Sequence, residues 1–215
     1  MNSVFYEEEF LRFKTVIVAN GEPPKHEACL KLLQQAERII CCDGAIDHLE
    51  ALGFVPDLIV GDGDSITPEQ RLKYSAIFLE NRDDTYCDLH KSIRYCQEQY
   101  YGEAVAIVGA SGLREDHELA NISLLLTYGA EIPLLMATNF GIFTPLFGTG
   151  TLASYPGQQI SIFTFANSPT TFHQLKYPVK EKQFDYFWEG SLNEAMENSF
   201  KIEFLQGKVL VFRAY

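Results

Sequence analysis

The chain has 215 residues, 47% of them hydrophobic, which is enough for one large domain or two small ones with a packed core. Its formal charge is −12 and its calculated pI is about 4.8. This charge argues against a nucleic-acid-binding protein, because phosphate backbones are bound by clustered Lys and Arg.

The five cysteines are odd in number and form no CxxC pair, so they indicate neither a disulfide framework nor a zinc site. We expect them to be buried thiols in a reducing compartment. No apolar run approaches the ~20 residues needed to span a bilayer. Residues Met1 to Phe10 include three consecutive glutamates and lack the pattern of a signal peptide. The sequence therefore predicts a cytoplasmic protein with no membrane partner, and it leaves the role of Glu7-Glu8-Glu9 open.

From Thr15 to about Thr138, short apolar runs alternate with helical stretches, a pattern typical of βαβ units and a parallel sheet. The predicted strands are Thr15 to Ala19, Arg38 to Cys42, Asp57 to Val60, Ala76 to Leu79, Ala104 to Val108 and Ile132 to Ala137. The predicted helices are His26 to Ala36, Ala45 to Leu52, Asp88 to Tyr100 and Glu115 to Tyr128. This order predicts a doubly wound, mostly parallel sheet with helices on both faces.

After about Asn139 the sequence becomes rich in Gly, Pro, Thr, Ser and aromatic residues, and helical periodicity nearly disappears. Apolar residues alternate in Gln159 to Phe163 and in Lys208 to Phe212. Short strands with regular turn signals favour a small antiparallel β-sandwich. We therefore expect an α/β domain over residues 1–140 and a β-sandwich domain over residues 141–215, with a boundary between Asn139 and Gly150.

Polar residues follow the first five predicted strands, at the edge where an open α/β sheet binds its ligand. These segments are Asn20-Gly21, Asp43-Gly44, Gly61-Asp62-Gly63-Asp64-Ser65, Asn81-Arg82-Asp83-Asp84 leading to Asp88-Leu89-His90-Lys91, and Gly109 to His117. Several carboxylates at one sheet edge would repel each other strongly unless cations lay among them. The pattern therefore predicts bound metal.

Asp62 and Asp64 stand one residue apart at the end of the apolar run Leu58-Ile59-Val60. Magnesium is usually held by one or two protein carboxylates, while water and substrate phosphates fill its other positions. The flanking glycines let the backbone turn tightly and approach a ligand. An isolated segment of this kind is more often a surface turn, so other segments have to decide between the two interpretations.

The turn Gly109 to Gly112 could offer backbone N–H groups and a helix N-terminus to an anion, although no P-loop and no GxGxxG pattern occurs. Arg114, His117 and Asn121 have the spacing of one helix face, and Arg114 could bind phosphate oxygens with its planar fork. The alternative is that Arg114 and Asp116 only form a first-turn ion pair and His117 is a satisfied polar residue.

Asp88 can likewise be explained as the N-cap of the helix that follows it, with Lys91 one turn later as a solvated lysine. In the functional interpretation, Lys91 points the same way as Asp88 and reaches a phosphate. The segment read alone does not choose between them.

Taken together, these motifs resemble thiamine pyrophosphokinase in their order and approximate spacing. The resemblance rests on Asp43-Gly44, Gly61 to Ser65, Asp88 to Lys91, Gly112 to His117 with Asn121, and, in the C-terminal part, Leu175-Lys176-Tyr177-Pro178, Trp188 and Gly190-Ser191-Leu192-Asn193-Glu194. It implies transfer of a diphosphoryl group from ATP to the hydroxyl of thiamine, with Mg²⁺, giving thiamine diphosphate and AMP. It also implies a homodimer whose thiamine pocket lies between the α/β domain of one subunit and the β domain of the other.

The resemblance also implies roles for individual residues. The catalytic positions are Asp43, Asp62, Asp64, Asp88, Arg114 and Asp116, and Asp43, Asp62 and Asp64 among them match the metal ligands. The nucleotide-binding positions are Asn20, Gly21, Gly44, Ser65, Lys91, Gly109, Gly112, Arg114 and His117. The thiamine-binding positions are Asp88, Asn121, Trp188, Ser191 and Asn193.

Three positions depart from the family pattern. Cys87 stands where the family usually has Thr before the acid, Leu113 replaces a glycine before the arginine, and Gly63 replaces an aromatic residue between the two acids. The departure at Cys87 leaves open whether Asp83, Asp84 or Asp88 is the working acid. The general base, the number of Mg²⁺ ions and the preferred nucleotide donor are also open.

Three competing functions remain. A Mg²⁺-dependent nucleotide pyrophosphohydrolase, or a pyrophosphokinase for another alcohol, would use the same acids. A non-catalytic nucleotide- or thiamine-binding module would explain Cys87 and Leu113. An interaction protein that dimerises through its β domain would leave the carboxylates at the strand ends without a cause.

Overall fold

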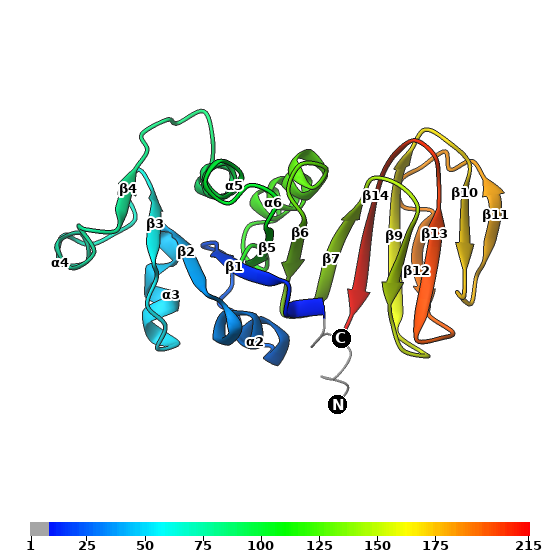
Figure 1. Ribbon diagram of the computed structural model, residues 1–215, viewed down its shortest axis with the longest axis horizontal. Helices are drawn as coiled ribbons and strands as arrows, with labels where there is room; N and C mark the ends of the chain where they lie inside the picture. Colours follow the sequence, from blue (N-terminus) through cyan, green and yellow to red (C-terminus); the bar gives the residue numbers. More distant parts are fainter. Residues whose placement is uncertain (1–8) are drawn as a thin grey trace.

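The computed structural model describes residues 9–215 (Figure 1). The helices are α2 (Glu27–Gln35), α3 (Ile46–Ala51), α4 (Pro68–Lys73), α5 (Asp88–Gln99) and α6 (Glu115–Tyr128), with one 3₁₀ turn, η1 (Asp43–Ala45). The strands are β1 (Phe13–Val18), β2 (Arg38–Cys42), β3 (Leu58–Gly61), β4 (Phe78–Glu80), β5 (Ala104–Val108), β6 (Leu134–Ala137), β7 (Gly141–Leu146), β8 (Gly150–Ala153), β9 (Gln159–Ala166), β10 (Thr170–His173), β11 (Val179–Lys182), β12 (Gly190–Glu194), β13 (Ser199–Glu203) and β14 (Gly207–Ala214). The expectations about a signal peptide and about Glu7-Glu8 concern residues 1–8, which lie outside the described part of the chain.

One ten-stranded sheet runs through the molecule in the order β12-β9-β14-β7-β6-β5-β1-β2-β3-β4. The strands from β6 to β4 are parallel. The chain starts at β1, moves outward to β4 and returns to the other side of β1 as β5 and β6. The strand order therefore reverses between β1 and β5, which is where ligands bind in sheets of this kind.

Helices cover both faces of the parallel strands, with α2 and α3 on one side and α5 and α6 on the other (Figure 1). In β1, Val16 and Val18 belong to the core under α2 and α3, whereas Ile17 belongs to the core under α5 and α6. Successive side chains of a strand point to opposite faces, so a strand buried on both sides has to be apolar throughout. The α/β fold expected from the sequence is confirmed.

The C-terminal strands form the expected sandwich. A four-stranded antiparallel sheet in the order β11-β10-β13-β8 packs against the antiparallel end of the long sheet (Figure 1). Between them lies a buried cluster that includes Ile160 and Ile162 of β9, Phe172 of β10 and Phe200 of β13. The alternation of apolar residues in these strands produces this inner layer.

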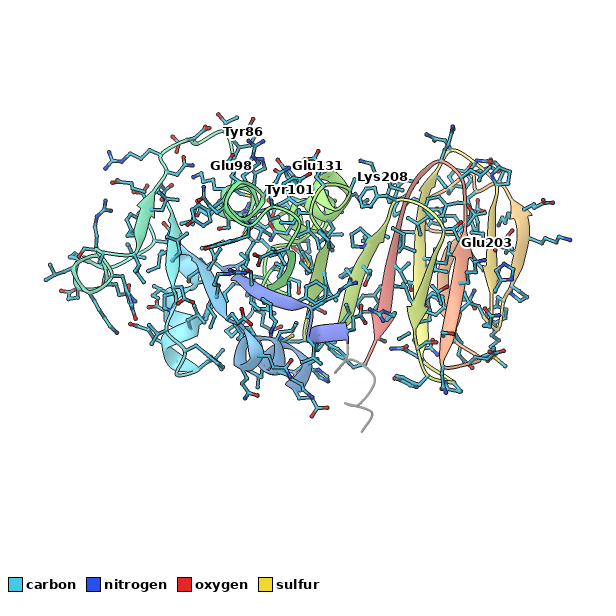
Figure 2. The ribbon with its side chains drawn as sticks, viewed as in Figure 1. Tyr86, Glu98, Tyr101, Glu131, Glu203 and Lys208 are labelled. Atoms are coloured by element: carbon cyan, nitrogen blue, oxygen red, sulfur yellow. The ribbon has the colours of Figure 1, made fainter. Side chains whose placement is uncertain are left out.

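The sheet continues across the predicted boundary at residues 140 and 141. Strand β7 pairs antiparallel with β6, with Met136 opposite Phe143 and Ala137 opposite Ile142. In addition, Lys208 of β14 donates from Nζ to the carbonyl oxygen of Leu126 in the last turn of α6, at 2.7 Å; Lys208 is labelled in Figure 2. The two halves therefore share backbone hydrogen bonds, and the division into 1–140 and 141–215 stays a prediction.

Two local expectations are wrong. Cys87 is exposed, unlike the other four free cysteines, because it stands in the loop before α5. Asp88 is the first residue of α5 and not its N-cap, which is Cys87. The Asp88 carboxylate is therefore not needed for capping.

Helix α4 is absent from the elements predicted by the sequence. It has six residues and begins with a capping box, in which Thr67 Oγ1 accepts from the amide of Gln70 and the Gln70 side chain accepts from the amide of Thr67. The longest helix in residues 9–215 is α6, with 14 residues, and no helix in this range is long and apolar enough to cross a membrane.

Candidate active site

A cavity of about 360 Å³ opens at the carboxyl ends of the parallel strands, beside the reversal point between β1 and β5. Eight predicted site residues line it: Asn20, Gly21, Asp43, Ser65, Asp88, Arg114, His117 and Asn121. The predictions missed the other lining residues, which are Ala19, Cys42, Cys87, Leu89, Ala110, Ser111, Leu113 and Glu118. Most of the missed residues directly neighbour a predicted one, so adjacency to the strand-end motifs was the available signal.

Ten predicted residues do not line this cavity: Gly44, Asp62, Asp64, Lys91, Gly109, Gly112, Asp116, Trp188, Ser191 and Asn193. Seven of them belong to the loops and helix starts around the cavity: Gly44, Asp62, Asp64, Lys91, Gly109, Gly112 and Asp116. Trp188, Ser191 and Asn193 belong to the C-terminal sandwich.

Glycines allow the loops after β1 and β5 to touch. The Gly21 amide donates to the carbonyl oxygen of Gly109 at 2.6 Å, and a Cβ on Gly21 would lie 2.6 Å from the same oxygen. Gly109 has φ +67° and Gly112 has φ +88°, a region that side-chain-bearing residues rarely adopt. These glycines therefore shape the wall of the cavity and need not contact a ligand themselves.

Asp43 is the most buried acid of the site, with 2% of its surface exposed. It stands in η1 directly after β2, and its Oδ2 accepts a hydrogen bond from the Gly63 amide at 2.8 Å. Burial raises the pKa of the Asp43 carboxyl from 3.8 to about 6, and the charges of Asp88 and Asp62 add to this rise. Asp88 and Asp62 therefore lie near enough to Asp43 for their charges to act on it.

Asp62 and Asp64 stand in the loop after β3. Asp62 is half-buried and its Oδ1 accepts from the Asp64 amide at 2.9 Å, whereas Asp64 is exposed. In residues 9–215 no three His, Cys, Asp or Glu side chains are close enough to form a ready-made metal site. The available donors are all oxygens, and Mg²⁺ needs only one or two carboxylates when phosphates supply the rest. The residues therefore fit Mg²⁺ that arrives with a phosphate ligand.

Asp88 is joined to Lys91, one helical turn later. Lys91 Nζ lies 3.1 Å from Asp88 Oδ1 and donates to the Asn81 carbonyl oxygen at 2.9 Å. Burial alone would lower the pKa of Lys91, but the hydrogen bond and charge of Asp88 outweigh it and raise that pKa. Lys91 is therefore a charged, nearly buried group, and the alternative of a solvated lysine is wrong.

The structure also bears on the choice between Asp83, Asp84 and Asp88. Asp83 and Asp84 are exposed, and Oδ1 of Asp83 accepts from the Thr85 amide at 2.9 Å. Of the three, only Asp88 lines the cavity. Geometry therefore favours Asp88.

Arg114 and Asp116 form the first-turn ion pair that was the alternative to a phosphate site. Nη2 of Arg114 is 2.6 Å from Oδ2 of Asp116, and Nε donates to Oδ1 at 3.1 Å. The Arg114 hydrogen bond lowers the pKa of Asp116. Both side chains are mostly exposed, and Arg114 also lines the cavity together with His117. An exposed ion pair of this kind contributes little to stability. Arg114 can therefore exchange Asp116 for a phosphate at a small cost in free energy.

Asn121 and Glu118 are held by the loop before α6. Asn121 Nδ2 donates to the carbonyl oxygen of Ala110 at 2.9 Å, and Glu118 Oε2 accepts from the Gly112 amide at 3.0 Å. The Gly112 amide is therefore occupied by Glu118 and is not free to bind an anion while that bond is present.

The C-terminal site residues differ in accessibility. Trp188 is 57% exposed and stacks on Tyr186, with ring centroids 5.9 Å apart. Asn193 is buried, and its side chain accepts from the amide and donates to the carbonyl oxygen of Tyr177. The Trp188 ring is accessible to a ligand, whereas the Asn193 side chain already forms hydrogen bonds within the fold.

Comparison with known proteins places the chain in a family. The model for the thiamin pyrophosphokinase catalytic domain matches residues 29–136, and the model for the thiamin pyrophosphokinase substrate-binding domain matches residues 141–212. The chain belongs to the thiamin pyrophosphokinase family. The two matches together include most of the chain and all the site residues named above except Asn20, Gly21 and Ala19.

Individual thiamin pyrophosphokinases show moderate similarity. Thiamine pyrophosphokinase 1 of Oryza sativa subsp. japonica is 28% identical over 60% of this chain and 57% of its own. Thiamin pyrophosphokinase 1 of Caenorhabditis elegans is 30% identical over 54% of this chain and 52% of its own. The chain thus spans about half the length of the curated relatives it matches. The solved thiamin pyrophosphokinase of Candida albicans superposes with a TM-score of 0.83 at 17% identity, covering 96% of this chain and 91% of its own, which supports the shared fold.

Proposed function

We propose that this protein is a diphosphotransferase that moves the terminal two phosphates of ATP, as one group, to the hydroxyl of thiamine. The products are thiamine diphosphate and AMP. The main support is the coincidence of the family match with an acidic cavity at the carboxyl ends of β1, β2, β3 and β5. A cytoplasmic location is part of the proposal, because the described cysteines are free thiols.

The reaction requires the thiamine hydroxyl oxygen to attack the β-phosphorus while the bond to the AMP oxygen breaks. Transfer of this kind depends on positioning and on neutralising phosphate charge more than on covalent catalysis. Mg²⁺ would be held by one or two of the carboxylates of Asp43, Asp62 and Asp64 together with substrate phosphates, and it would supply charge neutralisation at those phosphates. The buried Asp43 gives this set a fixed member, and the exposed Asp64 can adapt to the substrate.

Cationic side chains act on the same phosphates. Arg114 would exchange its exposed partner Asp116 for phosphate oxygens, and Lys91 would supply a fixed positive charge beside Asp88. Asn20, Gly21, Ser65 and His117 complete the proposed nucleotide side, and Gly44, Gly109 and Gly112 shape the backbone around it.

The thiamine hydroxyl has to lose its proton. Asp88 lines the cavity, as Asn121 does, and we assign Asp88 the orienting role at this oxygen. Asp43 and Glu118 also line the cavity, but Asp43 is assigned to the metal set and Glu118 accepts from the Gly112 amide, so Asp88 is the acid left for this role.

Thiamine also needs contacts that this cavity does not supply, because Trp188, Ser191 and Asn193 lie elsewhere in the chain. We propose that they come from a second copy in a homodimer. The exposed Trp188 ring would face the thiazolium cation or the pyrimidine. Asn193 would act indirectly, by fixing the segment at Tyr177. The proposed division into a catalytic part (1–140) and a thiamine-binding part (141–215) follows from this assignment.

The decisive experiment incubates purified protein with ATP, Mg²⁺ and thiamine and detects thiamine diphosphate and AMP by mass. We expect both products in equal amounts, and AMP only when thiamine is present. AMP formed without thiamine would instead identify a nucleotide pyrophosphohydrolase. Binding of ATP or thiamine without product would identify a non-catalytic module.

A further inference from the structure

The residues assigned so far leave an excess of negative charge on the β3 side of the site. Asp43, Asp62, Asp64 and Asp88 contribute four negative charges, and Lys91 is committed to Asp88. Arg114 stands before α6, on the β5 side of the site, whereas the acidic loop follows β3. Three strand spacings separate β5 from β3, about 14 Å in all. Even with Lys91 and one Mg²⁺ among these carboxylates the net charge stays negative, so a triphosphate reaching the β3 loop would need a further cation on that side.

Arg82 follows β4, next to this loop. Glu80 pairs with Gly61 in the parallel ladder, and the Asn81 amide donates to the Gly61 carbonyl oxygen at 2.7 Å. Arg82 therefore leaves the sheet beside residues 62–64. In Figure 1 the chain continues from β4 over the top of the sheet to α5. Because the Asn81 carbonyl also accepts from Lys91, the backbone that carries Arg82 is anchored to the site.

Glu80 fixes the orientation of two arginines at this position. Nε and Nη2 of Arg82 lie 2.7 and 2.6 Å from Glu80 Oε1, and Nη2 of Arg71 lies 3.0 Å from the same oxygen. One carboxylate between two guanidinium groups leaves one net positive charge. The Arg82 side chain is nevertheless 77% exposed, so part of its fork remains available.

Arg71 holds Glu80 and Arg82 close to the loop at residues 62–64. Its guanidinium lies over the Phe78 ring at 5.1 Å, and a Cβ on Gly63 would collide with its Nη1. Gly63 is the position where the resemblance leads one to expect an aromatic residue. In this chain the absence of that side chain makes room for Arg71, which supports Glu80 and, through it, Arg82.

We propose that Arg82, oriented by Glu80, binds the outermost phosphate of the nucleoside triphosphate. This assignment rests on the proposed function, and it adds a residue that distinguishes a triphosphate from shorter nucleotides. The charges of Asp62 and Asp64 also act on Arg82, in keeping with its place beside the loop that would hold the metal.

Calorimetry with Mg²⁺ tests this assignment without turnover. The probes are α,β-methylene ATP and α,β-methylene ADP, in which the bond that would break is blocked, and AMP. We expect Arg82→Gln to weaken binding of the ATP analogue about tenfold, the loss of one hydrogen bond to a charged group. Affinity for the ADP analogue and for AMP should stay within about twofold of the wild type. Arg82→Lys should recover part of the loss, because it keeps the charge without the fork.

Arg94→Gln is the matched control, since Arg94 is also an exposed arginine paired with a glutamate, Glu98, but lies in the middle of α5 and forms its pair within that helix. It should leave all three affinities unchanged. Equal loss for all three nucleotides in Arg82→Gln, or an unchanged affinity for the ATP analogue, would overturn the assignment. So would a wild-type protein that binds no ATP analogue. A wild type that binds it but makes no thiamine diphosphate would contradict the proposed function alone.

Discussion

Lys91 Nζ lies 3.1 Å from Asp88 Oδ1, and the Lys91 side chain is only 4% exposed. The same ammonium group donates to the carbonyl oxygen of Asn81. One lysine thus joins the first turn of α5 to the loop that leaves β4. It fixes the position of the acid that lines the cavity.

Replacing Lys91 by Met should therefore reduce both stability and turnover. The variant leaves the half-buried Asp88 carboxylate without its cation, and we expect a loss of about 2 kcal/mol in the free energy of unfolding. Urea titration measures this loss. Arg94→Met removes an exposed i,i+4 pair on the same helix and should cost under about 0.5 kcal/mol. Equal losses in the two variants would contradict a structural role for the buried ion pair.

Asp64→Asn should nearly abolish thiamine diphosphate formation while the thermal midpoint stays within about 2 °C of the wild type, because Asp64 is exposed. The measurement is turnover at saturating ATP and Mg²⁺. Asp83→Asn is the matched control, an exposed acid in the next loop whose amide oxygen can still accept from Thr85. Full activity in Asp64→Asn would remove this residue from the metal role, and loss of activity in Asp83→Asn would reopen the choice of working acid.

The raised pKa of Asp43 predicts a specific dependence of stability on pH in protein freed of metal by a chelator. Between pH 3.8 and about 6 the folded protein binds more protons at this carboxyl than the unfolded chain. The contribution of Asp43 to stability is therefore greatest below pH 3.8 and is lost as the pH rises through about 6.

Asp43→Asn should accordingly raise the free energy of unfolding by roughly 1–3 kcal/mol at pH 7.5, and the gain should shrink towards zero at pH 4. Chemical denaturation at the two pH values measures the difference. The variant should lose turnover, since the amide is a poorer metal ligand. A gain of the same size at both pH values would show that burial of the charge is not its cause.

Gly61→Ala should disturb the site without unfolding the protein. A Cβ at this position would lie 2.5 Å from Cγ and 2.6 Å from Oδ2 of the Asp43 carboxyl, so the carboxylate has to move. We expect at least a tenfold fall in turnover, because positioning controls transfer of this kind. Gly148→Ala is the control, since no atom lies within 4 Å of its Cβ position. If the two variants keep equal activity, the exact placement of Asp43 does not matter.

The sequence predicted most of the parallel half, and for a physical reason. The strands containing Val16, Ile40 and Ile107 are buried on both faces, so their apolar runs stand out against polar loops. Helix α4 was missed because six residues carry almost no periodic signal, although the capping box at Thr67 and Gln70 was readable.

The candidate site was predictable where a residue lies at or just beyond the end of a strand, as Asp43 does after β2 and Asn20 does two residues after β1. Lining residues such as Leu113 and Glu118 were not predicted, because their place in the wall depends on how the loop after β5 folds back. Whether Asp88 is the N-cap or the first residue of α5, and whether Cys87 is exposed in front of it, depends on where the helix starts to within one residue. Sequence patterns do not resolve a difference of one residue.

The pairing of β6 with β7 limits how the protein can be divided or can move. Because Met136 and Ala137 are bridged to Phe143 and Ile142, the halves cannot hinge apart without breaking a ladder in the middle of the molecule. Cutting the gene after codon 140 would leave β6 as a bare apolar edge, a template for aggregation. Attempts to express residues 1–140 alone should therefore yield insoluble material.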